Sequence, residues 1–226
     1  MKKISCIIAA YNEGPRIGDV LLAVVNHELI YEVIVIDDGS EDDTVEVVQS
    51  FTQVRLISQK NQGKSAAIAH GVEVSSGDFL LFIDADLCGL TRENVLELIY
   101  PVLHGEANAA ISLRNYPLWR MIGIDPLGGE RLLPRALITD ALGYLVKLHS
   151  FGLEVFINSL LITHKVPIAI VSWKNVESPF KSSKYGFWAG LKKDYRMIGD
   201  IFSTISIRQL FLQIIELRRL RVRHTP

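Results

Sequence analysis

The chain has 226 residues, of which 49% are hydrophobic, and 24 Lys and Arg against 25 Asp and Glu give it a net charge of -1. This length favours one large domain, with or without a small appendage, and is enough for a full core. The near-zero net charge gives no sign of a nucleic-acid partner.

No stretch of 18 uncharged apolar residues occurs, so we expect no transmembrane helix. Near the start, Lys2 and Lys3 precede the apolar run Ile4–Ala10, which Asn12 and Glu13 then interrupt. That run is too short for the core of a signal peptide, and no cleavage site of small residues follows it. We therefore expect no signal peptide.

The first half of the chain alternates predicted strands with predicted helices. The predicted strands are Ile4–Ala10, Glu32–Asp37, Val54–Ser58, Asp78–Ile83 and Ala107–Leu113, and the predicted helices are Pro15–His27, Asp42–Phe51, Gly63–Val74 and Thr91–His104. Such alternation implies right-handed crossovers and a parallel sheet with helices on both faces. The expected fold is α/β, with a doubly wound, mostly parallel sheet.

The second half is less regular. Prolines and glycines between Arg114 and Arg131 predict a functional loop. Helices at Pro134–Leu148 and Leu153–His164 and a strand at Val166–Trp173 are expected to complete the core. After Lys174 the chain is polar, and then helical to its end.

Two carboxylates, Asp84 and Asp86, follow the apolar run Phe79–Ile83 with one alanine between them. Parallel sheets bind ligands at the carboxyl ends of their strands, which is where this pair should lie. Two carboxylates this close together repel each other unless a cation neutralises them. Mg²⁺ or Mn²⁺ can do so, because these ions bind to one or two carboxylates together with phosphate oxygens. The pattern predicts a metal-bridged diphosphate site, and the alternative is a solvated acidic turn.

Two earlier loops should lie at the same edge of the sheet. They are Tyr11-Asn12-Glu13-Gly14 after the first strand and Asp37-Asp38-Gly39-Ser40 after the second. No G-x-G-x-x-G follows the first strand, so a dinucleotide site of the NAD type is not supported. Gly63-Lys64-Ser65 lacks the first glycine of a P-loop, because position 58 is serine.

Together these motifs resemble the family 2 glycosyltransferases of GT-A fold. The matching segments, in order and spacing, are Tyr11-Asn12-Glu13, Asp37-Asp38-Gly39-Ser40, Asn61-Gln62-Gly63-Lys64 and Asp84-Ala85-Asp86. The resemblance covers roughly residues 1–113. Within the family the chain looks most like polyprenyl-phosphate sugar transferases of the dolichol-phosphate mannose synthase type, and also like relatives that glycosylate small phosphorylated acceptors.

The resemblance implies a nucleotide-sugar donor, either a UDP- or a GDP-hexose. Asp38, with Asp37 beside it, would accept hydrogen bonds from the base and ribose, and Tyr11 and Glu13 would contact the same nucleoside end. Lys64 would lie near the nucleotide or its phosphates as a point charge. The alternatives to these roles are structural. Asp37 and Asp38 would form only a turn before a capped helix, and Glu13 and Lys64 would be solvated side chains.

The resemblance also implies that Asp86 binds Mg²⁺ or Mn²⁺ directly and that Asp84 binds it directly or through water. The metal would neutralise the diphosphate as it leaves. The dolichol-phosphate relatives often place a metal-assisting glutamine two residues after the second Asp. Here that position is Cys88, which departs from the pattern.

For the acceptor, the resemblance points to Arg114 after the fifth strand and to Gly128-Gly129-Glu130-Arg131, with Arg135 beyond. Glycines that precede a helix, with arginines beside them, suit a phosphate. Glu154 in the segment Gly152-Leu153-Glu154 is expected at the site, as a general base, as a group that orients the arginines, or as a helix cap. Solvated arginines in a surface loop are the alternative.

The C-terminal segment has apolar residues at helical spacing and a basic end. From Ile201 to Pro226, five arginines stand against Glu216, which gives a net charge of +4. Such a helix can lie on an anionic membrane surface. Tyr185, Phe187 and Trp188 add apolar bulk upstream. Packing on the domain or on a second copy in a homodimer is the alternative.

These features predict a metal-dependent glycosyltransferase that moves a hexose from a nucleotide sugar to a phosphate-bearing acceptor, most readily polyprenyl phosphate. A small soluble acceptor, and a non-catalytic nucleotide-sugar-binding or scaffold protein, are the alternatives. We expect residues 1–113 to bind the nucleotide sugar, 114–180 to bind the acceptor, and 181–226 to form a helical extension. The expected location is the cytoplasm, with peripheral contact at the inner membrane face.

Overall fold

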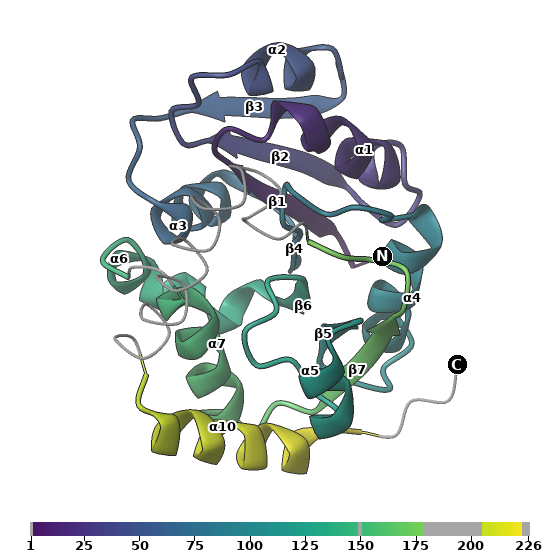
Figure 1. Ribbon diagram of the computed structural model, residues 1–226, viewed down its shortest axis with the longest axis vertical. Helices are drawn as coiled ribbons and strands as arrows, with labels where there is room; N and C mark the ends of the chain where they lie inside the picture. Colours follow the sequence, from purple (N-terminus) through teal and green to yellow (C-terminus); the bar gives the residue numbers. More distant parts are fainter. Residues whose placement is uncertain (1, 149–150, 179–204, 223–226) are drawn as a thin grey trace.

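In a computed structural model of the chain, which describes residues 2–148, 151–178 and 205–222, a sheet runs through the molecule with helices packed against it (Figure 1). Within these residues the sheet has seven strands in the order β3-β2-β1-β4-β6-β5-β7. The strands are β1 (Ile4–Ala10), β2 (Glu32–Asp37), β3 (Val54–Ser58), β4 (Phe79–Phe82), β5 (Ala109–Arg114), β6 (Arg131–Pro134) and β7 (Ile168–Trp173). All neighbours are parallel except β6, which runs antiparallel to both β4 and β5.

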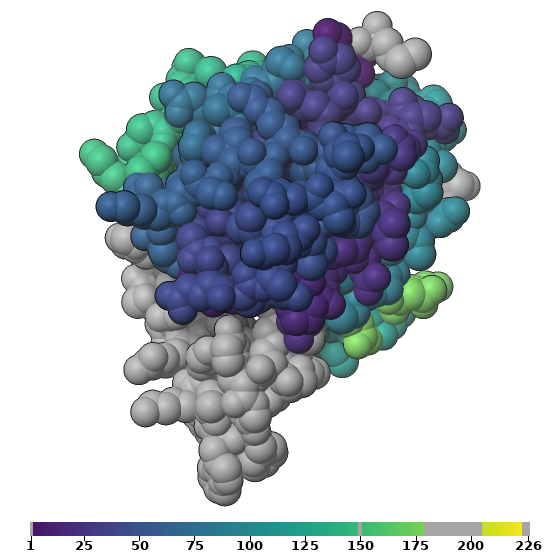
Figure 2. Space-filling view, turned by 90° about the horizontal axis from the view of Figure 1, so that it is seen from above, coloured from purple at the N-terminus to yellow at the C-terminus, as the bar shows by residue number. Residues whose placement is uncertain are grey.

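The helices connect these strands and extend the second half. They are α1 (Gly14–Val24), α2 (Thr44–Gln49), α3 (Lys64–Val74), α4 (Arg92–Leu103), α5 (Pro117–Ile122), α6 (Leu142–Leu145), α7 (Gly152–Thr163) and α10 (Ile207–Leu220). In Figure 2, seen from above, the N-terminal segments coloured purple to blue form a continuous surface over this end of the molecule.

The strands read as apolar runs because both faces of the sheet are buried. Alternate residues of β1 point to opposite faces, so Ile4 and Ile8 pack in one core cluster with α1 and α4. Ile7 belongs to a second cluster that includes side chains of α3 and α7. The predicted α/β fold with a doubly wound, mostly parallel sheet is confirmed.

Residues 114–148 differ from the prediction. The expected loop contains α5, and the helix expected at Pro134–Leu148 is wrong: β6 is followed by two 3₁₀ turns and the short α6. Leu132 and Leu133 of β6 are buried between β4 and β5. Only Leu132 and Leu133 of this four-residue strand are apolar and non-proline, and a run that short cannot be assigned to a strand or a buried helix by periodicity alone.

The C-terminal helix α10 packs on α7, and the residues that follow it contact β7. Gln213 donates through Nε2 to the Val155 carbonyl at 3.1 Å and to Ser159 Oγ at 3.0 Å. Beyond the helix, the Val222 backbone N–H donates to the Ile168 carbonyl at 2.9 Å, beside β7. Residues Tyr185, Phe187 and Trp188 lie outside the described residues, and the division of the chain at residues 113 and 180 stays a prediction.

The close contact of α3 with β1 provides a test of the packing. A side chain at Gly71 would collide with Ile7 Cγ2, so we expect Gly71→Ala to lower the free energy of unfolding by about 1–3 kcal/mol, the usual cost of overpacking. Chemical denaturation measures this change.

Gly143→Ala in α6 is the matched control, because within the described part of the chain no atom outside the helix's own backbone lies within 4 Å of a Cβ at that position. We expect that variant to be neutral or slightly more stable than the wild type. Equal stabilities for the two variants would contradict the close contact of α3 with β1.

Candidate functional site

A cavity of about 420 Å³ opens at the carboxyl ends of β1, β2 and β4, where an open parallel sheet binds its ligands. It is lined by Ala9, Ala10, Tyr11, Glu13, Asp38, Lys64, Asp84, Ala85, Asp86, Phe151 and Glu154. The three predicted loops therefore meet in one place. Of the described residues that line the cavity, five are acids and Lys64 is the only cation.

The loops after β1 and β2 are tied together by hydrogen bonds. The Asn12 backbone N–H donates to Ser40 Oγ at 2.9 Å, and the Glu13 N–H donates to Thr44 Oγ1 at 2.8 Å. Tyr11 lines the cavity and is exposed, so one face of its ring is accessible. The carboxylate of Glu13 lies 3.4 Å from Arg16 Nη1.

The two acids of the second loop have different surroundings. Asp37 is buried and accepts from the Ser40 backbone N–H at 3.0 Å, so it shapes the turn and does not line the cavity. Asp38 reaches the cavity and is held by the loop after β3. It accepts from the backbone N–H groups of Gln62 at 2.9 Å and Gly63 at 2.8 Å.

Lys64 lies between two acids from distant parts of the chain. Its Nζ is 2.8 Å from Asp84 Oδ1 and 2.9 Å from Glu154 Oε1. A lysine at the start of α3 opposes the helix dipole, and the two carboxylates offset that cost. Burial lowers the pKa of Lys64, but the charges of Asp84 and Glu154 outweigh burial and raise it above its ordinary value.

A buried carboxyl group, Glu130, lies behind Asp84. Its Oε2 accepts from Ser112 Oγ at 2.7 Å and is 3.5 Å from Arg114 Nε. Burial raises the pKa of Glu130 to about 7, although Arg114 opposes the shift. Burial also raises the pKa of Asp84, but Lys64 and Arg114 outweigh it and hold that pKa below its ordinary value.

Gly129 explains how this arrangement fits. A Cβ at that position would lie 2.5 Å from Asp84 Oδ1, so only glycine lets β6 begin directly against the carboxylate. Gly129 therefore makes room for Asp84, while Gly128 lies against Asp125, and the two glycines precede a strand and not a helix. Glu130 carries no role in the sequence prediction, and the glycines before it were the one signal that pointed to it.

Asp86 lines the cavity and is hydrogen-bonded to Ser178. Its Oδ1 accepts from Ser178 Oγ at 3.3 Å, and Ser178 also accepts from Arg114 Nη1. The described residues contain no group of three or more His, Cys, Asp or Glu side chains arranged to hold a metal ion. Two carboxylates are enough, however, where a diphosphate supplies the remaining oxygens.

The balance of charge in the cavity also fits a metal. Five carboxylates and one lysine would repel a diphosphate, so an anionic ligand requires a cation beside it. Asp84 is paired with Lys64, and Asp86 lines the same cavity two residues further on. Cys88 is exposed and does not line the cavity.

Glu154 lies at the start of α7 with 3% of its surface exposed. Its Oε1 pairs with Lys64, and its Oε2 is buried with no hydrogen-bond partner among the residues that the structure describes. An unpaired buried acceptor at a cavity wall is suited to a ligand hydroxyl. The prediction that Glu154 belongs to the site agrees with this position.

The three predicted acceptor arginines all contact protein groups. Arg131 is 1% exposed, and it donates to the carbonyls of Gly128 and Pro126 and to Asn158 Oδ1 at 2.7–2.9 Å. Arg135 donates to the Ser75 carbonyl near the opposite end of β4. Arg114 is the counter-ion of Glu130, so none of these side chains lines the cavity.

This chain is similar to known proteins in sequence and in fold. The model of the family described as Glycosyl transferase family 2 matches residues 5–119. A dolichyl-phosphate beta-glucosyltransferase of Trichomonas vaginalis is 39% identical over 105 residues, 40% of this chain and 31% of that protein. An undecaprenyl-phosphate 4-deoxy-4-formamido-L-arabinose transferase of Pseudomonas savastanoi is 33% identical over 99 residues, 38% of this chain and 29% of that protein.

The matched segment thus spans less than a third of the length of either relative. Among solved structures, glucosyl-3-phosphoglycerate synthase from Mycobacterium tuberculosis, in complex with Mn²⁺, UDP-glucose and phosphoglyceric acid, is similar with a TM-score of 0.67. It is 25% identical, and the match covers 90% of this chain and 79% of that one. The predicted GT-A fold is confirmed, and so is the resemblance to polyprenyl-phosphate sugar transferases.

Glu130 makes the stability of the protein depend on pH. Its pKa rises from an ordinary 4.5 to about 7 on folding, so the folded state holds the proton more tightly than the unfolded chain. The stabilisation is fully present below the lower value and is lost as pH rises through the higher one. Between about pH 5 and pH 8, we expect the wild type to lose on the order of 2 kcal/mol of unfolding free energy relative to Glu130→Gln.

Urea denaturation at several pH values measures this difference. Glu97, an exposed acid on α4, gives the control, and Glu97→Gln should follow the wild type at every pH. Parallel pH profiles for the wild type and Glu130→Gln would rule out a protonated Glu130 in the folded protein.

Proposed function

The chain belongs to glycosyl transferase family 2, and from that membership we infer that it transfers a hexose from a nucleotide sugar to a phosphate-bearing acceptor. The observation that carries the proposal is the meeting of Asp38, Lys64, Asp84 and Asp86 in one cavity at the carboxyl ends of parallel strands. The nucleoside end would lie toward Tyr11, Glu13 and Asp38. The diphosphate would lie toward the acids that follow β4.

A divalent metal, Mg²⁺ or Mn²⁺, would bind to Asp86 and, directly or through water, to Asp84. When bound, it supplies positive charge to the diphosphate as the sugar–phosphate bond breaks. Solved complexes of the similar glucosyl-3-phosphoglycerate synthase with UDP and either Mn²⁺ or Mg²⁺ support this assignment. Arg114 would support the site indirectly, because its Nη1 donates to Ser178 and the Ser178 hydroxyl donates to Asp86.

In the transfer, a bond forms between the anomeric carbon and an acceptor oxygen, and the bond from that carbon to the diphosphate breaks. The electron pair of the broken bond leaves with the nucleoside diphosphate. If the acceptor oxygen belongs to a phosphate it is already anionic, so Glu154 then accepts a hydrogen bond from a sugar hydroxyl through Oε2. If the acceptor is an alcohol, Glu154 takes the hydroxyl proton as a general base.

Polyprenyl phosphate is the acceptor that we favour, because curated relatives are named for dolichyl phosphate and undecaprenyl phosphate. A small phosphorylated acid is the second candidate, supported by the likeness to a structure that contains phosphoglyceric acid. A protein that binds nucleotide sugars without catalysis is a third. Product analysis with each acceptor, after a screen of donors, distinguishes the three.

The exposed side of α10 favours a membrane-bound acceptor. Leu217 packs inward, whereas Ile207 is 68% and Phe211 62% exposed. Arg208, Arg218 and Arg219 are exposed on the same helix, so apolar and basic side chains lie together on its outer surface. In the described residues no helix has the length and apolar character to cross a bilayer. We propose peripheral contact at the cytoplasmic face, with a homodimer interface as the alternative.

Replacing Asp86 tests the metal assignment. We expect Asp86→Asn to abolish turnover and to remove the metal-dependent rise in melting temperature that a nucleotide sugar produces, because the ligand stabilises only the state that binds it. Thermal unfolding with UDP- and GDP-sugars, with and without Mn²⁺, measures the effect.

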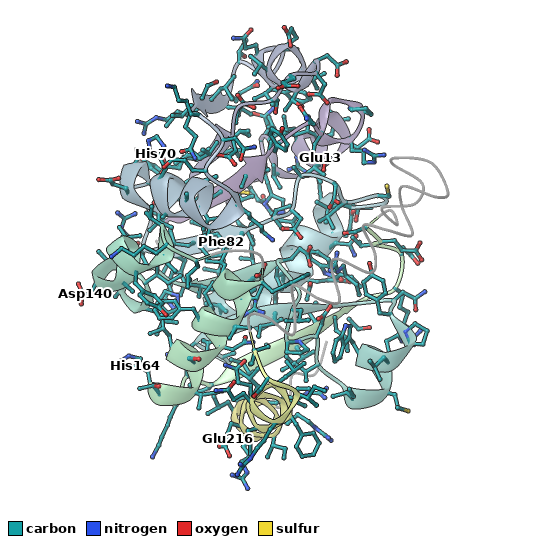
Figure 3. The ribbon with its side chains drawn as sticks, turned by 60° about the vertical axis from the view of Figure 1, so that its left-hand side comes forward. Glu13, His70, Phe82, Asp140, His164 and Glu216 are labelled. Atoms are coloured by element: carbon teal, nitrogen blue, oxygen red, sulfur yellow. The ribbon has the colours of Figure 1, made fainter. Side chains whose placement is uncertain are left out.

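Asp140→Asn serves as the control, because Asp140 is exposed and lies far from the cavity (Figure 3). Metal-dependent stabilisation that survives in Asp86→Asn would show that the metal is held elsewhere. The absence of any shift in the wild type would count against the proposed activity.

The double variant Ile207→Ser, Phe211→Ser tests the membrane contact. Each apolar side chain buried in lipid stabilises the bound state by about 1.5–3 kcal/mol, so we expect the variant to bind vesicles at least about tenfold more weakly. Flotation with vesicles that contain anionic lipid measures binding.

Leu22→Ser in α1 is the control, since Leu22 is 64% exposed on a helix remote from α10 (Figure 1). Equal loss of binding in both variants, or no binding by the wild type, would exclude α10 as the membrane contact.

A further inference from the structure

The carboxylate of Asp38 has most of its hydrogen-bonding capacity occupied by the protein. A carboxylate offers about four acceptor positions, two on each oxygen. Both positions of Oδ1 are used, by Gln59 Nε2 at 2.8 Å and by the Gln62 backbone N–H at 2.9 Å. Oδ2 accepts from the Gly63 backbone N–H at 2.8 Å. Asp38 therefore has one acceptor position left, on Oδ2, for a ligand in the cavity.

The side-chain amide of Gln59 is fixed in one orientation by its two neighbours. Asp38 offers only acceptors to it, so the NH₂ group must face Asp38 and Oε1 must face the other way. Oε1 lies 2.9 Å from His70 Nδ1. Since Oε1 can only accept, His70 must carry a proton on Nδ1.

His70 does not line the cavity that contains Asp38, Asp84 and Asp86. It lies on α3 beside a second cavity of about 410 Å³, whose lining includes Gln59, Gln62 and Glu73. Figure 3 shows His70 on the opposite side of the upper half of the molecule from Glu13. A chain of hydrogen bonds thus runs from the second cavity, through His70 and Gln59, to Asp38 at the first cavity.

We propose that Gln59 and His70 are positioning residues that restrict Asp38 to a single ligand hydrogen bond and thereby make the donor site prefer uridine over guanosine nucleotides. Uracil presents one imide N–H between two carbonyl groups, which matches one free acceptor. Guanine presents two adjacent donors, N1–H and the amino group, which require two free acceptors on one carboxylate. This inference rests on the proposed function, because it assumes that Asp38 faces the nucleobase.

The other acid at the nucleoside end, Glu13, lies on the loop after β1. The carboxylate of Glu13 is shared with Arg16, whose Nη1 donates to Oε2 at 3.4 Å. A guanine base at Asp38 would find one free acceptor on that carboxylate for its two adjacent donors, and an unpaired buried donor weakens binding. The described part of the cavity wall holds no other carboxylate near Asp38 that is free of Lys64 and of the β4 loop.

Calorimetric titration of the full chain with UDP and with GDP, each with Mn²⁺, tests the preference. We expect UDP to bind at least about tenfold more tightly, the ratio for one lost hydrogen-bond match. Equal affinities, or tighter binding of GDP, would overturn the inference and leave the proposed function intact. If neither nucleotide binds, the proposed function fails, and the base preference fails with it.

Matched variants at His70 test the positioning role. His70→Asn keeps a nitrogen donor at the place of Nδ1, whereas His70→Ala removes it. We expect His70→Ala to lower the ratio of UDP to GDP affinity roughly tenfold and to raise the donor KM, with kcat and the acceptor KM unchanged. His70→Asn should restore the ratio, and so separate a positioning role from general destabilisation.

A measurement without nucleotide completes the test. The ¹⁵N chemical shifts of the His70 ring report which nitrogen carries the proton. We expect a protonated Nδ1 in the wild type and a changed shift in Gln59→Leu. A neutral ring protonated on Nε2 alone, or identical behaviour of His70→Ala and His70→Asn in donor binding, would overturn the proposal.

Discussion

The contact of Lys64 with both Asp84 and Glu154 is the interaction on which the site depends. It joins the start of α3, the loop after β4 and the start of α7, three elements that are far apart in the sequence. Without the lysine, two carboxylates would face each other at the wall of the cavity with no cation between them, and their like charges would repel each other. The pairing explains why a cation is tolerated at the N-terminus of a helix.

A second set of charged side chains, Glu130 and Arg114, supports the contact of Lys64 with the two carboxylates. Glu130 and Arg114 lie behind Asp84, and Gly129 leaves room for its carboxylate. Arg114 and Arg131, which the sequence suggested for a ligand, contact protein groups in this structure, and Arg131 donates to the carbonyls of Gly128 and Pro126 beside Gly129. The cavity therefore has little positive charge of its own. A metal brought with the diphosphate is the simplest source of the charge that an anionic donor requires.

Local patterns predicted the first half of the fold well. Strands β1, β2 and β3 have the predicted bounds, because each is an apolar run that turn residues limit on both sides. Asp38, Lys64, Asp84 and Asp86, which were predicted from their places after strands or at a helix start, line one cavity, and their roles stay predictions. Prediction failed at β6, whose antiparallel insertion between β4 and β5 depends on long-range pairing that four residues cannot signal.

By itself, the sequence determined the α/β class, the order of elements up to β5 and the edge of the sheet where the acids gather, because strand periodicity and loop composition are local properties. Only the tertiary structure decided which charges meet. The pairing of Lys64 with Glu154 spans 90 positions in the chain, and the burial of Glu130 depends on β6 lying beside β5. Such contacts are set by the packing of distant segments, and no short stretch of sequence contains them.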